Sequence, residues 1–196
     1  MGRTREFDRD VVLWEAVDLF RHRGYRNVSI ADLEKATGLV SGSIYNAFGD
    51  KAGLFEAALH HYIEKFVTPR LQAFAGAEAR LEELEQLFLT VFEPALADGG
   101  GCLVTNSVIE FGTSDASVAR ELSAVLDLVR SKIGGVITRE LGPADAPAAT
   151  MRLVLLYHGM LTLSRSATPL PDMAAAIRAE FTTLRAARDR VSPSPK

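Results

Sequence analysis

The sequence predicts an all-α protein of about nine helices. Apolar residues recur three and four positions apart through most of the chain, and no sustained alternation of apolar and polar residues indicates a strand. Of the 196 residues, 47% are hydrophobic and 24% are charged, a composition that supplies a buried core. Glycines and prolines stand between the periodic stretches, as at Gly38, residues 99–101, Gly142 and Pro143.

The first helix is expected over residues 8–23. Val12, Ala16 and Phe20 fall on one face at helical spacing, and the basic residues of the last turn suit the negative end of the helix dipole. Gly24 follows at a position where helices commonly end in a left-handed residue.

Residues 29–48 predict two short helices joined by a turn. Ser29 is a favourable N-cap, and Asp32 completes a capping box, so one helix begins here and ends at Gly38. A second helix of about two turns starts near Val40 and buries Ile44 and Phe48. It leaves an uncharged outer face of Ser41, Gly42, Ser43, Tyr45 and Asn46. Two helices joined by a glycine-containing turn are typical of a motif that places its second helix in the major groove of DNA.

The later helices follow from apolar stripes and breakers. A fourth helix begins at Asp50 and is expected to end or bend at Pro69. In the seventh, Gly134 and Gly135 favour a bend or close packing. The expected ranges of the fifth to ninth helices are 78–97, 102–111, 118–141, 146–167 and 171–190.

Composition limits the compartment and the partners. The single cysteine excludes an intramolecular disulfide, and the sequence starts without the apolar run of a secretory signal. No stretch approaches the roughly 18 uncharged apolar residues that cross a bilayer, so we expect a cytoplasmic protein. The net charge is -3, and residues 1–51 hold eight basic and eight acidic side chains, which argues against a polycation that binds nucleic acid non-specifically.

A combined pattern runs through the first third of the chain, at Gly24, Tyr25, Ser29, Ala31, Leu33, Ala36, Gly38, Gly42, Ser43, Ile44, Tyr45, Phe48, Lys51, Leu54 and Phe55. Through this pattern the chain resembles the TetR family of bacterial transcriptional repressors. It departs from the family at Val40 and Ser41, where members often have Ser or Thr followed by Lys or Arg.

The resemblance implies a domain organisation and an assembly. Residues 1–51 would form a helix-turn-helix DNA-binding domain that extends into a linking helix over 51–68. Residues 69–190 would form an all-helical domain for ligand binding and dimerisation, with a disordered tail over 191–196. The dimer would bind a palindromic operator, and it would form through the eighth and ninth helices, because their apolar stripes otherwise leave a large exposed patch.

The expected DNA contacts fall into two groups. Ser29, Tyr45 and Lys51 are suited to bonding phosphates, although each alone equally fits an exposed cap, a half-buried tyrosine or a solvated lysine. A flexible arm with Arg3 and Arg5 would add contacts. Asn46 can bond adenine, and no arginine of this helix reads guanine. The predicted DNA-binding residues are Ser29, Ala31, Ser41, Gly42, Ser43, Tyr45, Asn46 and Lys51.

The resemblance also places a ligand cavity in the second domain, although the same apolar residues equally fit a plain core. The aromatic content favours a small, largely hydrophobic inducer, with Thr105 among the polar groups that orient it. The predicted ligand-binding residues are Phe66, Phe88, Phe92, Cys102, Asn106, Tyr157 and His158.

Other functions were weighed against this one. Cys102 follows three glycines at the start of a helix. Its segment looks like one in a branch of the TetR family that includes sensors of oxidants or electrophiles, which makes a cysteine-based sensor the first alternative. A lone cysteine, however, is more often a small buried hydrophobic residue. The common hydrolase, metalloprotease and P-loop patterns are missing, so we expect no enzyme and no cofactor. His60 and Glu64 with His158 make a poor metal site, because no Cys/His cluster accompanies them. A helical interaction module without operator binding is the third alternative.

Overall fold

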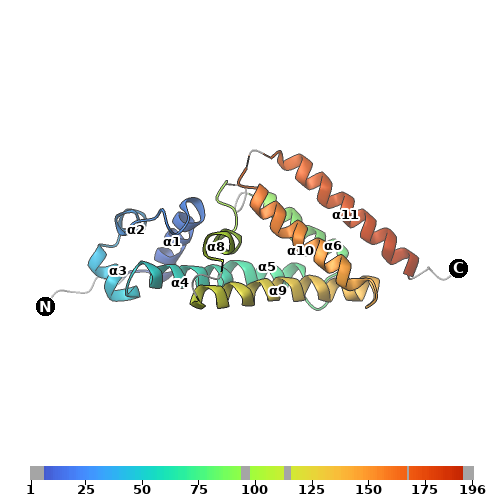
Figure 1. The fold of residues 1–196 in the computed structure, drawn as a ribbon, viewed down its shortest axis with the longest axis horizontal. Helices are drawn as coiled ribbons and strands as arrows, with labels where there is room; N and C mark the ends of the chain where they lie inside the picture. Colours follow the sequence, from blue (N-terminus) through green and yellow to red (C-terminus); the bar gives the residue numbers. More distant parts are fainter. Residues whose placement is uncertain (1–6, 94–97, 113–115, 167, 192–196) are drawn as a thin grey trace.

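The computed structural model describes residues 7–93, 98–112, 116–166 and 168–191. It is elongated, with α1, α2 and α3 at one end and α11 at the other (Figure 1). The all-α prediction is confirmed, because the described residues form helices and connections without a strand. Counting α4, η1 and α5 as one run, they contain nine helical segments besides the short turn η2, as expected.

The first helix, α1 (Arg9–Arg23), has the predicted ends. The Asp8 carboxylate accepts the Asp10 N–H at 3.0 Å and caps the start, and Gly24 closes the end with a φ of 77°. Phe20 is fully buried on the inner face of this helix.

The next two helices, α2 (Ile30–Thr37) and α3 (Ser41–Phe48), match the predicted pair. Ser29 and Asp32 form both bonds of the capping box, and Gly38 ends α2 in the left-handed conformation. Ile44 is fully buried and holds α3 against the core.

A longer run than predicted connects the two ends of the molecule. α4 (Lys51–Tyr62) passes into a π-helical turn, η1 (Ile63–Val67), and then into α5 (Thr68–Phe74). Pro69 was expected to end or bend this helix, but helical structure continues past it. Proline has no N–H, and its ring collides with the carbonyl four residues earlier in a regular α-helix. The wider π-turn before Pro69 accommodates the ring without breaking the run.

The fifth predicted helix is shorter than residues 78–97. α6 (Leu81–Leu89) begins late because the Glu83 carboxylate accepts the Arg80 N–H at 2.9 Å, which makes Arg80 the cap. It passes into a 3-10 turn, η2 (Thr90–Phe92), where the Thr90 hydroxyl donates to the Leu87 carbonyl at 2.6 Å. Residues 94–97 lie outside the described part of the chain.

The last four helices agree with the prediction to within a few residues: α8 (Leu103–Phe111), α9 (Ala116–Leu141), α10 (Ala146–Leu163) and α11 (Leu170–Val191). α10 ends before residue 167 because the Ser164 and Ser166 hydroxyls bond the carbonyls of its last turn. In α9, a Cβ built at Gly134 would lie 3.4 Å from Thr150 of α10, an ordinary van der Waals contact, so α9 and α10 pack here at a distance that a small side chain also fits. The expected arm with Arg3 and Arg5 and the tail over 192–196 lie outside the described residues.

One hydrophobic core runs through the whole molecule. It joins Phe20 of α1 and Phe55 of α4 to Phe88 of α6 and Phe181 of α11 without interruption. α8 lies where these parts meet, in contact with α1, α4, α9 and α10 (Figure 1). None of the described helices combines the length and the apolar character needed to cross a bilayer.

Candidate functional site

The outer face of α3 is polar and open to solvent. Gly42, Tyr45 and Asn46 are exposed, with Tyr45 at 50% of its accessible surface, and Ser41 and Ser43 are half-buried. Val40 at the N-cap has no capping side chain, as expected. Glu34 of α2 supplies the missing acceptor, since its carboxylate accepts the Ser41 N–H. The two helices are therefore locked together, and α3 presents a fixed polar surface.

Two of the predicted phosphate ligands already have partners within the protein. The Ser29 hydroxyl donates to the Asp32 carboxylate at 2.5 Å and accepts the Asp32 N–H. The pKa of Asp32 is lowered mainly by that hydroxyl and by the Ser29 N–H, which donates to the same carboxylate at 2.9 Å. The Lys51 ammonium donates to the carbonyls of Tyr25 (3.0 Å) and Val28 (2.8 Å), and lies 4.2 Å from the centre of the Tyr25 ring. Two of the three ammonium donors thus hold the start of α4 against the loop before α2. Ala31 is exposed on the same side of the motif.

A nearly closed cavity lies between the π-turn η1, α5, α8, α9 and α10. Its volume is about 20 Å³, room for about one water molecule. Four predicted ligand-binding residues line it, namely Phe66, Cys102, Tyr157 and His158, together with Thr105. Burial raises the pKa of Tyr157 well above its ordinary value and lowers that of His158, so both side chains are neutral near pH 7.

Three other predicted ligand-binding residues lie elsewhere. Phe88 is buried in the core, with its ring centre 5.2 Å from that of Tyr157 and 5.3 Å from that of Phe181. Phe92 packs against the same core from η2. The Asn106 side chain donates to the carbonyls of Arg21 and Gly100, so it joins α8 to α1 and does not line the cavity.

Two polar lining residues were missed in the sequence. Tyr62 and Arg70 stand four residues before and after Phe66, which is the spacing of one helix face. That spacing was a usable signal, but the expected end of the helix at Pro69 separated Arg70 from the pattern. The Arg70 guanidinium carbon lies 4.8 Å from the centre of the Phe66 ring.

The exposure of Cys102 does not favour redox sensing. Its residue is only 8% exposed, and its side chain lines the cavity together with Tyr62 and Tyr157. A sensing thiol needs access to its oxidant or electrophile, and this one is enclosed.

The polar contacts between α1 and the segment before α8 form a junction, which we define as Asp18, Arg21, His22, Asp98 and Asn106. Arg21 is buried; its Nε donates to the Gly101 carbonyl at 2.9 Å and its Nη2 to Asp98 at 2.7 Å. Desolvation opposes ionisation of Asp98, but the Gly100 N–H and the charges of Arg21 and His22 outweigh it, so the pKa of Asp98 is lowered.

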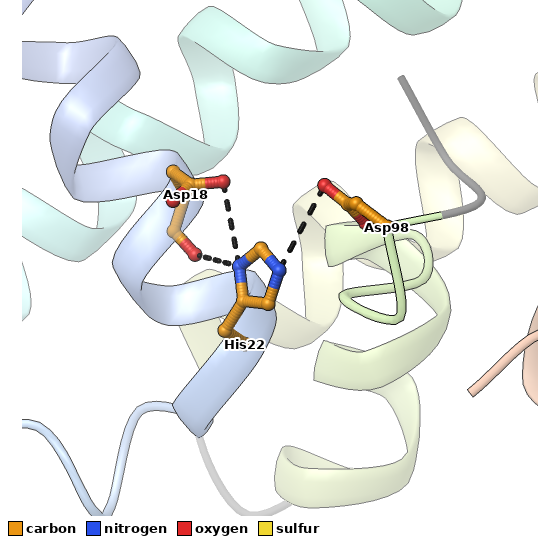
Figure 2. Close-up of side chains that lie close together, drawn as sticks. All are labelled: Asp18, His22 and Asp98. Atoms are coloured by element: carbon orange, nitrogen blue, oxygen red, sulfur yellow. Dashed lines mark hydrogen bonds and ion pairs between the residues drawn. The ribbon is translucent and has the colours of Figure 1, made fainter. Parts of the chain in front are cut away.

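Within the junction, His22 lies between two carboxylates (Figure 2). Its Nδ1 is 3.3 Å from Asp18, and its Nε2 is 3.7 Å from Asp98. These three side chains are the one trio of candidate metal donors among the described residues. Because the two ring nitrogens face different carboxylates and Arg21 already pairs with Asp98, we assign the arrangement to a polar bridge between α1 and the segment before α8. His60, by contrast, contacts Glu121 at 3.1 Å, and no trio forms with His158.

A second contact joins α8 to the end of the molecule that contains α1, α2 and α3, which we call the reading end (Figure 1). The Glu110 carboxylate accepts the N–H groups of Tyr25 at 2.8 Å and Arg26 at 2.7 Å, just after α1. One short helix therefore contributes Thr105 to the cavity wall and two side chains, Asn106 and Glu110, to the start of the DNA-binding motif.

Comparison with known proteins agrees with this architecture. Residues 12–58 match the model of the bacterial regulatory proteins of the tetR family. The chain is 31% identical to the HTH-type transcriptional repressor ComR of Escherichia coli over 63% of this chain and 60% of ComR. It is 32% identical to YezE of Bacillus subtilis, an uncharacterized HTH-type transcriptional regulator, over 61% of this chain and 63% of YezE. The chain thus matches about 60% of the length of these curated relatives.

Solved structures extend the likeness to nearly the whole chain. A cysteine mutant of the TetR family transcriptional regulator CifR, complexed with 26-bp operator DNA, superposes with a TM-score of 0.78 at 27% identity, covering 92% of this chain and 98% of that one. A TetR transcriptional regulator from Chloroflexus aurantiacus gives a TM-score of 0.69 at 26% identity, covering 89% and 90%. These proteins are described as regulators and not as enzymes. The N-terminal motif thus matches the tetR family model, and the whole fold is similar to that of TetR family regulators of known structure.

Proposed function

We propose that the protein is a dimeric transcriptional repressor that binds a palindromic operator through α3 and is released by a small molecule bound in the cavity. The exposed, uncharged face of α3, fixed on a buried Ile44, is the observation that carries the proposal. The likeness to CifR complexed with operator DNA supports it. Such a regulator works in the cytoplasm, where the DNA is.

On the DNA, α3 enters the major groove with its N-terminal half toward the bases. Asn46 and the two serines of α3 meet base edges, Gly42 allows close approach of the backbone, and Tyr45 bonds a phosphate. Ala31 of α2 and Lys51, through its third ammonium donor, contact the backbone of the DNA. Ser29 joins them by exchanging its hydroxyl bond to Asp32 for one to a phosphate. Because α3 carries no charged side chain, sequence preference depends on shape and on uncharged contacts.

Selection of bound sequences from random duplexes tests operator binding. We expect a palindrome whose half-sites lie about one helical turn apart. Tyr45→Ala should weaken binding to all sequences, whereas Asn46→Ala should change the selected sequence; both side chains are exposed, so the fold is preserved. A helical interaction module would enrich no palindrome, and that result would overturn the proposal.

Release requires a path from the cavity to α3. α8 contributes to the cavity wall and bonds the end of α1, while the α4–η1–α5 run carries Phe66 at the cavity and leads directly to α3. We expect the ligand to favour a shifted position of α8 or of the α4–η1–α5 run. Such a shift changes the distance between the two α3 helices of the dimer and lowers operator affinity.

A further inference from the structure

We propose that the ligand of the cavity is a small monocarboxylate with an apolar body, and that its charged end binds Arg70. This inference rests on the proposed function, since it names the chemical class of the inducer. Three features of the cavity support it: a cation paired only with neutral groups, two buried polar atoms without partners, and otherwise apolar walls.

Arg70 is a partly buried cation whose described contacts are neutral. Its guanidinium lies over the Phe66 ring, and its Nη2 donates to the Thr90 hydroxyl. Thr90 in turn donates to the Leu87 carbonyl, so the guanidinium is held in place by a fixed acceptor. Within the described ranges, no acidic side chain lines the cavity and no carboxylate forms an ion pair with Arg70. A partly buried cation without a counter-charge is less favourable than a paired one, and a bound anion supplies the missing charge.

Two further polar atoms lack partners at the same place. The Tyr62 hydroxyl and His158 Nε2 are buried and make no hydrogen bond within the described part of the chain. Burial raises the pKa of Tyr62 well above its ordinary value, so the hydroxyl keeps its proton and acts as a donor. The Thr105 hydroxyl lies 3.4 Å from His158 Nδ1; when it donates there, the neutral ring carries its proton on Nε2. Arg70, Tyr62 and His158 then all offer donors, the complement of a carboxylate.

The rest of the wall is apolar and narrow. Val104, Val125, Val129 and Leu161 face the cavity, which suits an aromatic or aliphatic body. With a volume of about 20 Å³, the cavity has to widen to admit such a body. Phe66 and Val67 belong to the π-turn η1, and π-turns are common at adjustable functional sites. Entry of the ligand therefore displaces η1 and moves the helical run that leads to α3.

The experiment compares acids with their neutral amides on the full-length protein. Benzoate and hexanoate are titrated against benzamide and hexanamide, and dissociation constants are measured by calorimetry at pH 7.5. The emission of Trp14, the one tryptophan of the chain, is a second readout, because its ring centre lies 6.5 Å from that of Tyr62. We expect at least one acid to bind about tenfold or more tightly than its amide, the size of a charge-assisted hydrogen bond.

Three variants assign that preference to a residue. Arg70→Gln should abolish the preference for the acid, and Arg70→Lys should retain part of it. Lys65→Gln is the matched control: it removes a positive charge from the π-turn that precedes α5, but Lys65 is exposed and does not line the cavity, so the preference should persist. Thermal unfolding of each variant checks that the fold is intact.

The outcomes separate this inference from the proposed function. Equal binding of acid and amide by the wild-type protein, no binding of any probe, or a preference that survives in Arg70→Gln would each overturn the carboxylate assignment. Operator binding is measured on the same samples and stands independently of those results. An acid that binds through Arg70 without releasing the operator would support the ligand site and contradict its role as the inducer site.

Discussion

Single side-chain hydrogen bonds join α1 and the loop after it to α8, in addition to the hydrophobic core that these elements share. Arg21 bonds Gly101 and Asp98, Asn106 returns a bond to the Arg21 carbonyl, and Glu110 accepts two backbone N–H groups after α1. These polar groups are largely satisfied by one another, so removal of one member leaves a buried partner unpaired. The junction should therefore respond strongly to single substitutions.

At this scale, Asp98→Asn should lower stability at neutral pH and change its pH dependence. The pKa of Asp98 lies below the ordinary 3.8 in the folded protein, so ionisation of this side chain stabilises the fold above that pH. That contribution is lost as the pH falls through the lowered pKa. Because Asp98 is about one-third exposed, the expected loss at pH 7 is only about 0.5–1 kcal/mol.

Urea denaturation at pH 7 and at pH 3 measures this difference. The gap between wild type and Asp98→Asn should narrow at pH 3, because below the ordinary pKa of 3.8 the unfolded chain binds the proton and the stabilising contribution of the ionised Asp98 declines. Asp127→Asn, at an exposed position of α9, is the control and should change little. An equal gap at both pH values would refute an electrostatic role for Asp98.

Glu110→Ala should lower the free energy of unfolding more than Glu110→Gln does. It removes the acceptor of both the Tyr25 and Arg26 N–H groups, with an expected loss of about 1–3 kcal/mol. Glu110→Gln keeps one acceptor oxygen and should lose less. Urea midpoints of the two variants test this order, and an Ala variant as stable as the Gln variant would show that the pair of bonds is not needed.

At the scale of elements, backbone approach decides how α3 and α4 are placed. The turn between them brings the end of α3 so close to the start of α4 that a Cβ built at Gly53 would clash with the Phe48 carbonyl oxygen. At Gly42, on the outer face of α3, a Cβ would meet nothing within 4 Å. The backbone therefore requires a glycine at position 53 but leaves room for a side chain at position 42.

Gly42→Ala and Gly53→Ala should consequently act in opposite directions. Alanine at position 42 fills open space in a helix and should raise stability by about 0.5–1 kcal/mol. It should also lower operator affinity, because the added methyl group faces the DNA in the proposed complex. Gly53→Ala should lower stability, since backbone has to move to admit the methyl group. Thermal unfolding and operator titration separate the two effects; unchanged operator affinity in Gly42→Ala would contradict the proposed close approach.

For the whole molecule, the exposed apolar side chains are the basis for predicting where a second copy would bind. On α10, Met151, Leu155 and Leu163 are 40%, 66% and 46% exposed, and Ile109 of α8 is 68% exposed. An apolar groove between α8, α9 and α10 contains most of these residues. A patch of this kind on a lone chain favours association. It lies on α8 and α10, so it supports the predicted role of α10 in a dimer but not that of α11, where the described residues include no exposed large apolar side chain.

Leu155→Glu should convert the dimer to a monomer at micromolar concentration. The side chain is exposed in the single chain, so the fold should persist while a charge is placed in the interface. Val11→Glu, at a 55% exposed apolar position of α1, is the control and should remain dimeric. Sedimentation equilibrium measures the mass; a monomeric wild-type protein would exclude this interface.

Local chemistry alone determined α2, α3 and the polar outer face of α3. The capping box at Ser29, the left-handed glycine after α2 and the spacing of Ile44 and Phe48 all act within a few residues of chain, so the sequence predicted α2, α3 and the polar face between them. The four predicted ligand-binding residues that line the cavity came from the family resemblance, which supplies the long-range arrangement that periodicity does not contain.

Only the tertiary structure decided which polar groups meet. Arg70 reaches the cavity because a π-turn carries the helix past Pro69, and Asn106 serves the junction because α8 packs against α1. Glu34 caps α3, and Lys51 binds two carbonyls across a gap of more than twenty residues. These contacts join residues far apart in the chain, and their geometry depends on how whole helices pack. A sequence pattern determines the face of a helix, but the partner that face meets is determined by packing.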